Sequence, residues 1–115
     1  MTYGIQFEQG EIIVVPFPFS NLSGIKQRPV LVISHENYNK ESLDIITCGI
    51  TSNLRRESYS ILVTNQNMEN GNIPKVSKIK VDKIFTLDKS IVKKRLGKVT
   101  EETFDRVKKE FFKMV

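Results

Sequence analysis

The sequence KQRPVLVIS, from Lys26 to Ser34, sets a basic segment directly before a run of apolar residues. The run is short, aliphatic and opened by a proline, so it predicts a strand over Pro29–Ser34 that is buried on both faces. Arg28 precedes that proline, and we expect it at the mouth of the strand with its backbone held in place. A guanidinium fixed in this way is suited to bind phosphate. The same residues are equally consistent with a surface arginine at the end of a loop.

Composition limits the kind of protein this chain can be. With 115 residues it fits one domain, residues 1–115, that can bury a core without disulfides or structural metal. Cys48 is the only cysteine and His35 the only histidine, so neither a disulfide framework nor a His/Cys metal site can form within one chain. No apolar run approaches the roughly 20 residues that span a bilayer, and no signal peptide is recognisable. We therefore expect a cytoplasmic protein with no cofactor and no membrane contact.

The net charge of +5 is concentrated in the second half of the chain. The segment 75–98 carries only Asp82 and Asp88 as acidic residues, against a dense series of basic ones: Lys75, Lys78, Lys80, Lys83, Lys89, Lys93, Lys94, Arg95 and Lys98. A surface of this kind attracts a polyanion such as RNA or DNA, or an acidic protein. A solvated lysine face that only keeps the protein soluble is the alternative.

The periodicity predicts a mainly β chain closed by one helix. Besides Pro29–Ser34, strands are expected over four further ranges: Glu11–Phe17, Asp44–Ile50, Tyr59–Thr64 and Val76–Phe85. A polar loop is expected over Pro18–Gln27. In the last of these, alternation puts Lys78 and Lys80 on one face and Ile79 and Val81 in the core.

A helix is expected after Thr100, which can cap it, with Glu101 and Glu102 near the positive end of its dipole. Phe104, Val107, Phe111 and Met114 follow at helical spacing, and such a stripe packs on a core. Short strands and one terminal helix predict a strongly curved antiparallel sheet or small barrel.

Five segments, read in order, resemble the MazF/PemK family of toxin endoribonucleases: Gly10–Phe19, Arg28–Ser34, Ile50–Ser52, Val81–Lys89 and Leu96–Val99. No single motif is specific, but the ordered set covers nearly the whole chain. The resemblance implies a small SH3-like β-barrel of the MazF/CcdB type with a C-terminal helix. It also implies a homodimer that cleaves single-stranded RNA at short sequences without metal and is inhibited by an acidic antitoxin protein.

Metal-free RNA cleavage uses the ribose 2′-OH as nucleophile and leaves a 2′,3′-cyclic phosphate and a 5′-OH end. By resemblance, Arg28 is the catalytic arginine. Its guanidinium is permanently charged and presents a planar fork of donors, so it is better suited to stabilise the phosphorane than to abstract a proton. Thr51 matches the second catalytic position, where a hydroxyl can contact the scissile phosphate, and Ser52 beside it duplicates the donor. Ordinary turn chemistry would also explain both hydroxyls. His35 cannot supply both acid and base alone, and its place just beyond a strand indicates a structural or exposed residue.

Asp82 aligns with an acidic position that some members use near the site, which makes it a further catalytic candidate, although a structural ion pair or turn contact explains it equally well. Lys80 stands where some members carry arginine, and because lysine lacks the bidentate fork we expect it to bind phosphate. The other candidates for RNA binding are Lys26, Gln27, Asn53 and Lys83. Phe17 and Phe19 could stack on bases, but we expect them to pack in the core.

Two other functions remain open at this level. The first is a protein-binding toxin of the same fold, like the gyrase poisons, but such a protein has no use for the Arg28–Thr51 pair. The second is a catalytically weak relative that binds RNA or DNA for regulation, which would show salt-dependent affinity without cleavage.

Overall fold

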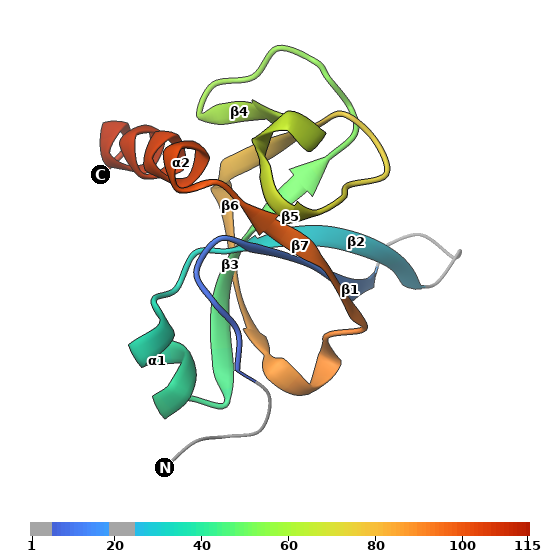
Figure 1. The fold of residues 1–115 in the computed structure, drawn as a ribbon, viewed down its shortest axis with the longest axis vertical. Helices are drawn as coiled ribbons and strands as arrows, with labels where there is room; N and C mark the ends of the chain where they lie inside the picture. Colours follow the sequence, from blue (N-terminus) through green and yellow to red (C-terminus); the bar gives the residue numbers. More distant parts are fainter. Residues whose placement is uncertain (1–5, 19–24) are drawn as a thin grey trace.

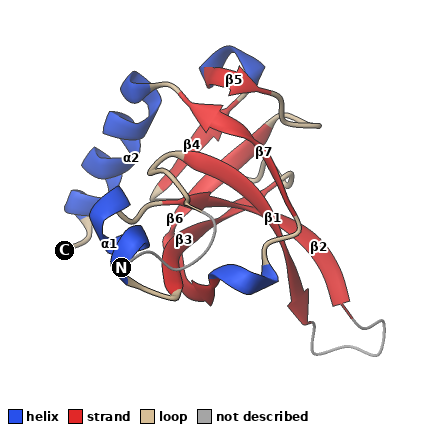
Figure 2. Ribbon diagram, turned by 60° about the horizontal axis from the view of Figure 1, so that its bottom comes forward, coloured by secondary structure: helices blue, strands red, loops and turns tan. Residues whose placement is uncertain are grey.

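The computed structural model describes residues 6–18 and 25–115, which form one curled antiparallel sheet with a helix at the C-terminus (Figures 1 and 2). The strand order across the sheet is β4-β6-β3-β2-β1-β7-β5. The strands span β1 Glu11–Pro18, β2 Ile25–Val32, β3 Asp44–Thr51, β4 Ser60–Val63, β5 Met68–Gly71, β6 Ser77–Asp88 and β7 Lys94–Val99. The helices are α1 Glu36–Glu41 and α2 Glu101–Lys113, with single 3₁₀ turns at Asn65–Asn67 and Lys89–Ile91. This confirms the predicted mainly β fold with a curved sheet and a closing helix.

The central strands β1 and β2 bury both of their faces. In β1, Ile12 packs in one core with Leu31 of β2, while Ile13 packs in a second core with Val30 and Val32. Successive strand residues point to opposite faces, so a continuous apolar run serves two cores at once. The prediction of burial on both faces is confirmed for Val30, Leu31 and Val32, which are fully buried, but β2 ends at Val32 and not at the predicted Ser34.

The start of β2 corrects the expected position of Arg28. β2 begins at Ile25, and Arg28 lies inside it, paired with Val15 of β1, rather than at its mouth. Proline lacks an N–H and is therefore tolerated in a strand only where one ladder is missing. Pro29 meets that condition, because it pairs with Val14 of β1 whereas pairing with β3 begins only at Val30. The predicted loop Pro18–Gln27 is correspondingly shorter, and residues 19–24 lie outside the described part of the chain.

Helix α2 forms as its sequence predicts. The Thr100 hydroxyl accepts a hydrogen bond from the Thr103 backbone N–H at 3.2 Å. The stripe of Phe104, Val107, Phe111 and Met114 packs against the first core. The charges of the first and last turns complement the helix dipole.

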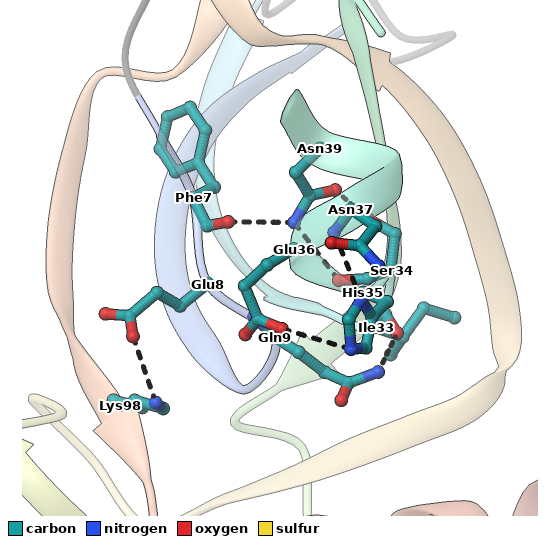
Figure 3. A network of polar contacts seen from close by, with 10 residues as sticks. All are labelled: Phe7, Glu8, Gln9, Ile33, Ser34, His35, Glu36, Asn37, Asn39 and Lys98. Carbon is teal, nitrogen blue, oxygen red and sulfur yellow. Dashed lines mark hydrogen bonds and ion pairs between the residues drawn. The ribbon is translucent and has the colours of Figure 1, made fainter. Parts of the chain in front are cut away.

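Helix α1 was not predicted, because six residues give too little periodicity to recognise. His35 caps it, and its Nδ1 accepts from the Asn37 backbone N–H at 3.0 Å, which is the structural role expected of this residue. Buried Asn39 donates to the Phe7 carbonyl at 2.9 Å and to the Ser34 carbonyl at 3.1 Å, and its side-chain oxygen accepts from the Ser34 hydroxyl (Figure 3). These contacts tie the segment before β1 to the far end of β2.

Two glycines face each other where β5 pairs antiparallel with β7, and neither strand was predicted. Gly71 of β5 is paired with Gly97 of β7, and their φ angles are +72° and +153°. A Cβ on Gly97 would lie 2.2 Å from the Asn70 carbonyl oxygen, and a Cβ on Gly71 would lie 2.1 Å from the Leu96 carbonyl oxygen. Only glycine permits this approach of two backbones.

Candidate functional site

Arg28 and Thr51 are neighbours across strands β2 and β3. The ladder pairs Leu31 with Cys48 and Val30 with Gly49, and the same register carried two residues further sets Arg28 opposite Thr51. Alternation along β2 puts Arg28 on the face of Val30, and alternation along β3 puts Thr51 on the face of Gly49. By this register the two residues predicted to act together come opposite each other on one face, two residues beyond the last pair of the β2–β3 ladder.

Strand β6 adds two lysines to this face. Lys78 is paired with Thr51, and Lys80 is paired with Gly49, while Ile79 between them is fully buried. The predicted alternation of this strand is confirmed. The row Arg28–Thr51–Lys78 thus crosses three adjacent strands and carries positive charge on either side of the threonine hydroxyl.

Both lysines are also bound to the segment that follows β3. The Lys78 Nζ donates to the Arg55 carbonyl at 2.9 Å, and the Lys80 Nζ forms an ion pair with Glu57. The hydrogen bond and charge of Lys80 lower the pKa of the Glu57 carboxyl. Lys80 was predicted to bind RNA, and the structure gives its ammonium a protein partner that holds this segment.

Two consecutive turns, each closed by a hydrogen bond from a backbone N–H to a side-chain oxygen, shape the segment that follows β3. The Thr51 Oγ1 accepts from the Asn53 backbone N–H at 3.1 Å, and the Asn53 Oδ1 accepts from the Arg55 backbone N–H at 3.0 Å. This is the turn chemistry that the sequence also allowed. Because a hydroxyl can donate one hydrogen bond while it accepts others, the Thr51 proton is not used by this turn. The turns leave Arg55 and Arg56 exposed beside the site, and neither was a sequence-based candidate.

Ser52 lies on the opposite side of β3 from Thr51, at the open end of the sheet. It lines a cavity of about 310 Å³ with residues from several elements: Lys26, Gln27, Arg28, Pro29, Ile50, Ile73, Pro74, Lys75, Ser77 and Leu96. We call this the mouth cavity. The structure thus brings the predicted residues Lys26, Gln27, Arg28 and Ser52 to one cavity, whose described lining does not include Thr51, and it adds Lys75, which was not a sequence-based site candidate.

Asp82 and Lys83 lie further along β6 than Lys80, at a bulge. β6 pairs Lys80 with Gly49 and Ile84 with Cys48, so the residues between them have no partner on β3. Asp82 and Lys83 are exposed there, and among the described residues that line the mouth cavity neither is present. Burial, with the negative charge of Asp82, raises the pKa of the Cys48 thiol to about 12, so this cysteine is no nucleophile at neutral pH.

The charge around Arg28 and the mouth cavity is positive. The cavity wall carries Lys26, Arg28 and Lys75, and no aspartate or glutamate occurs among its described lining residues.

Within residues 6–18 and 25–115, no three His, Cys, Asp or Glu side chains gather in a group that could hold a metal ion. Over the same residues, neither helix has the length and apolar character needed to cross a membrane. The side chains of Phe17 and Phe19, considered as base-stacking groups, lie outside what the structure describes.

The chain is thus a small curled antiparallel sheet closed by one C-terminal helix, with an arginine and a threonine set opposite each other by the register at its open end. Residues 8–115 match the model of the PemK-like, MazF-like toxins of type II toxin-antitoxin systems, and the chain belongs to this family. A comparison with curated proteins found no match.

Solved structures of other proteins share this fold. The chain resembles an endoribonuclease from Mycobacterial species, with 18% identity, a TM-score of 0.74, and coverage of 95% of this chain and 90% of that one. It also resembles the MazE-MazF structure (Form-III) from Deinococcus radiodurans, with 18% identity, a TM-score of 0.75 and 96% of each chain covered. A third similar structure is an endoribonuclease in complex with its cognate antitoxin from Mycobacterial species, with 19% identity, a TM-score of 0.71, and 93% and 92% covered. At these identities the likeness shows the fold.

Proposed function

We propose that this protein is a metal-independent, sequence-selective endoribonuclease that cleaves single-stranded RNA, the toxin of a type II toxin-antitoxin pair. The observation that carries the proposal is the β2–β3 register, which sets Arg28 opposite Thr51 and beside the β6 lysines that are paired with Thr51 and Gly49. Family membership and the named endoribonucleases of similar fold support the same reaction.

In the proposed reaction the ribose 2′-OH attacks the adjacent phosphorus, and the bond to the 5′-oxygen of the next nucleotide breaks. The products are a 2′,3′-cyclic phosphate and a 5′-OH end. The Arg28 guanidinium holds the negative charge that grows on the phosphorane, because it presents two parallel donors to phosphate oxygens. The Thr51 hydroxyl donates to a phosphate oxygen. Arg28 remains protonated throughout, so the 2′-OH proton leaves to water, and water returns a proton to the leaving 5′-oxygen to give the 5′-OH.

The remaining predicted residues take supporting roles in this proposal. Lys26, Gln27, Ser52 and Asn53 contact the RNA strand next to the scissile phosphate. Lys80 positions the segment Asn53–Glu57 through its ion pair with Glu57. Asp82 and Lys83 lie at the bulge of β6, farther along this β-strand than Lys80, and contact the RNA from there.

We also propose a cytoplasmic homodimer that an acidic antitoxin inhibits. Support for the dimer is an apolar groove of about 360 Å³ between α2 and the sheet, edged by Ile84 and Phe112, which are 41% and 68% exposed. Support for the antitoxin is the basic surface at the mouth cavity and the antitoxin complexes among structures of similar fold. Sedimentation equilibrium of the purified chain tests the dimer, and a Phe112→Glu variant should shift it to monomer.

The test of the reaction is cleavage of mixed-sequence RNA in EDTA, with the new ends mapped. We expect 5′-OH ends at a short preferred sequence. Arg28→Ala should lower the cleavage rate by about 10²- to 10³-fold, as for the loss of one donor to a transition-state oxyanion. Arg28→Lys keeps the charge but loses the fork and should recover only part of the rate.

Two further variants complete the design. Thr51→Val removes the hydroxyl but keeps the β-branched shape and should also slow cleavage. Lys113→Ala removes a charge on α2, where Lys113 pairs only with its helix neighbour Glu110 among the described residues, and should cut at the wild-type rate. Absence of 5′-OH ends from the wild type, or equal cutting by Arg28→Ala, contradicts the proposed reaction. Salt-dependent RNA binding without cleavage would identify the regulatory relative instead.

A further inference from the structure

A second hollow adjoins the mouth cavity, and we call it the side groove. Its volume is about 450 Å³, and it is lined by Val14, Gln27, Pro29, Pro74, Lys93, Lys94 and Leu96. Gln27, Pro29, Pro74 and Leu96 also line the mouth cavity, so the two hollows lie next to each other. A strand of RNA held at Arg28 would therefore meet the side groove within its neighbouring nucleotides.

Strand pairing explains why these side chains face the same way. Val14 of β1 is paired with Pro29 of β2 on one side and with Lys94 of β7 on the other. Gln27 lies two residues before Pro29 on β2 and therefore points to the same face. The groove is thus built on three adjacent strands of the sheet, which hold its floor rigid.

The chemistry of the lining fits a nucleotide. Val14, Pro29, Pro74 and Leu96 form an apolar floor that can lie against the flat face of a base. Gln27 brings a single amide, which offers both donors and an acceptor to the edge of a base. Most sequence-specific recognition of RNA acts on such splayed, unstacked bases.

The charges of the side groove select for an anion. Lys93 and Lys94 are exposed on one side of it, and no carboxylate occurs among its described lining residues. Two ammonium groups next to an apolar floor can contact the phosphates on either side of a bound base while the base lies on the floor. Lysine serves this role as a point charge without sequence preference.

We propose that the side groove binds one nucleotide of the single-stranded RNA substrate, beside the scissile phosphate, and that Gln27 reads its base. This proposal rests on the proposed endoribonuclease function and deepens it by naming a specificity site. Lys93 and Lys94 bind the flanking phosphates, and Pro29 and Pro74 support the face of the base. An acidic peptide would satisfy the two lysines as well, but it would leave the apolar floor and the amide unused.

The first experiment measures base preference. A pool of RNA with random sequence around the cut is digested by the wild type, Gln27→Glu and Lys113→Ala, and the cut sites are sequenced. Gln27→Glu replaces the donating amide with a carboxylate of the same shape. We expect it to change the preferred base at one position flanking the cut and to leave the other positions unchanged, while Lys113→Ala keeps the wild-type profile. An unchanged profile for Gln27→Glu overturns the proposal.

The second experiment measures binding and does not depend on cleavage. Fluorescence anisotropy of a labelled RNA decamer is recorded with Arg28→Ala and with Arg28→Ala carrying Lys93→Ala and Lys94→Ala, at several salt concentrations. The slope of log K against log salt should become shallower by about 0.7 for each phosphate that the protein no longer neutralises. Equal slopes overturn the proposal. If the added substitutions weaken binding of a poly-glutamate peptide but not of RNA, the side groove is a peptide site and the proposal is likewise wrong.

The two experiments separate failure of this proposal from failure of the proposed function. A wild type that neither cuts RNA nor binds the decamer contradicts the endoribonuclease itself. A different result is a wild type that cuts at a preferred sequence, while the Gln27 variant leaves the cleavage profile unchanged and the Lys93 and Lys94 variants leave the salt slope unchanged. That result contradicts only the assignment of the side groove.

Discussion

The close approach of Gly71 to Gly97 makes a sharp prediction about stability. Gly97→Ala places a methyl group 2.2 Å from the Asn70 carbonyl oxygen and 2.8 Å from the Gly71 Cα, and both are backbone atoms that cannot rotate away. The same residue has φ of +153°, a conformation that alanine adopts only under strain. The substitution must therefore move β5 away from β7 or force alanine into an unfavourable backbone conformation.

The size of the effect follows from these two terms. A residue held in such a backbone region costs about 1–3 kcal/mol. Relief of the overlap requires β5 to shift, which removes backbone hydrogen bonds worth about 1 kcal/mol each. We expect Gly97→Ala to lower the free energy of unfolding by about 3 kcal/mol or more.

Gly49 provides the matched control within the same sheet. A Cβ there would lie 3.6 Å from the Lys83 Cβ and 3.8 Å from the Phe85 Cε2, which are ordinary contacts. Alanine is favoured over glycine in a strand by about 0.5–1 kcal/mol, so Gly49→Ala should be neutral or slightly stabilising. Urea unfolding followed by circular dichroism measures both variants. If Gly97→Ala unfolds at the same urea concentration as Gly49→Ala, the described approach of β5 to β7 is wrong.

Three more perturbations test other parts of the structure. Lys80→Met removes the partner of Glu57 and should speed trypsin cleavage in the segment 53–57 without changing the melting temperature, and equal cleavage would contradict the tether. Asn39→Ala leaves the Phe7 carbonyl and the Ser34 hydroxyl without their buried partner and should cost about 2–3 kcal/mol in a urea titration. The pKa of Cys48 is raised from 9.0 to about 12, so between these values the unfolded chain loses its thiol proton while the folded protein keeps it. Stability should therefore fall as pH rises from 9 to 12, less so in Cys48→Ala, and the native thiol should resist alkylation at about pH 8.

The elements with strong local signals were predictable from the sequence. The run Val30–Val32 is apolar without interruption, and β6 alternates through Lys78 and Lys80, so both strands and their faces could be predicted. Thr100 and the apolar stripe behind it likewise indicated α2. Each of these signals depends on residues close together in the chain.

The elements that were missed depend on partners far along the chain. β7 reads KRLGKV, which carries little alternation, and it forms because it pairs with the central strand β1 and with β5. The extension of β2 back to Ile25 also depends on β1, which pairs with residues that look like loop. Strand pairing of this kind cannot be read from a single stretch of sequence.

The candidate site shows the same division. Arg28 and Thr51 could be named from the resemblance, but their placement side by side follows from the β2–β3 register. That Lys78 and Lys80 bind the segment Asn53–Glu57 is known only from the structure. The alternation of a strand indicates which face a lysine lies on, but not which group it binds. Lys75, Lys93 and Lys94 were only part of a basic segment until the folded sheet set them beside Gln27.

The two cores on either side of β1 and β2 have a consequence for the motions of the protein. Amide hydrogens of Ile12–Val15 and Val30–Val32 are shielded from water on both faces of the sheet, so we expect them to exchange only when the whole molecule opens. The short strands β4 and β5 form the two edges of the sheet and should exchange through local fraying. Arg28 lies on β2, one of the protected strands, while Pro74, which also lines the mouth cavity, follows the edge strand β5. We therefore expect the rim of the cavity to open and close around an arginine that stays in place.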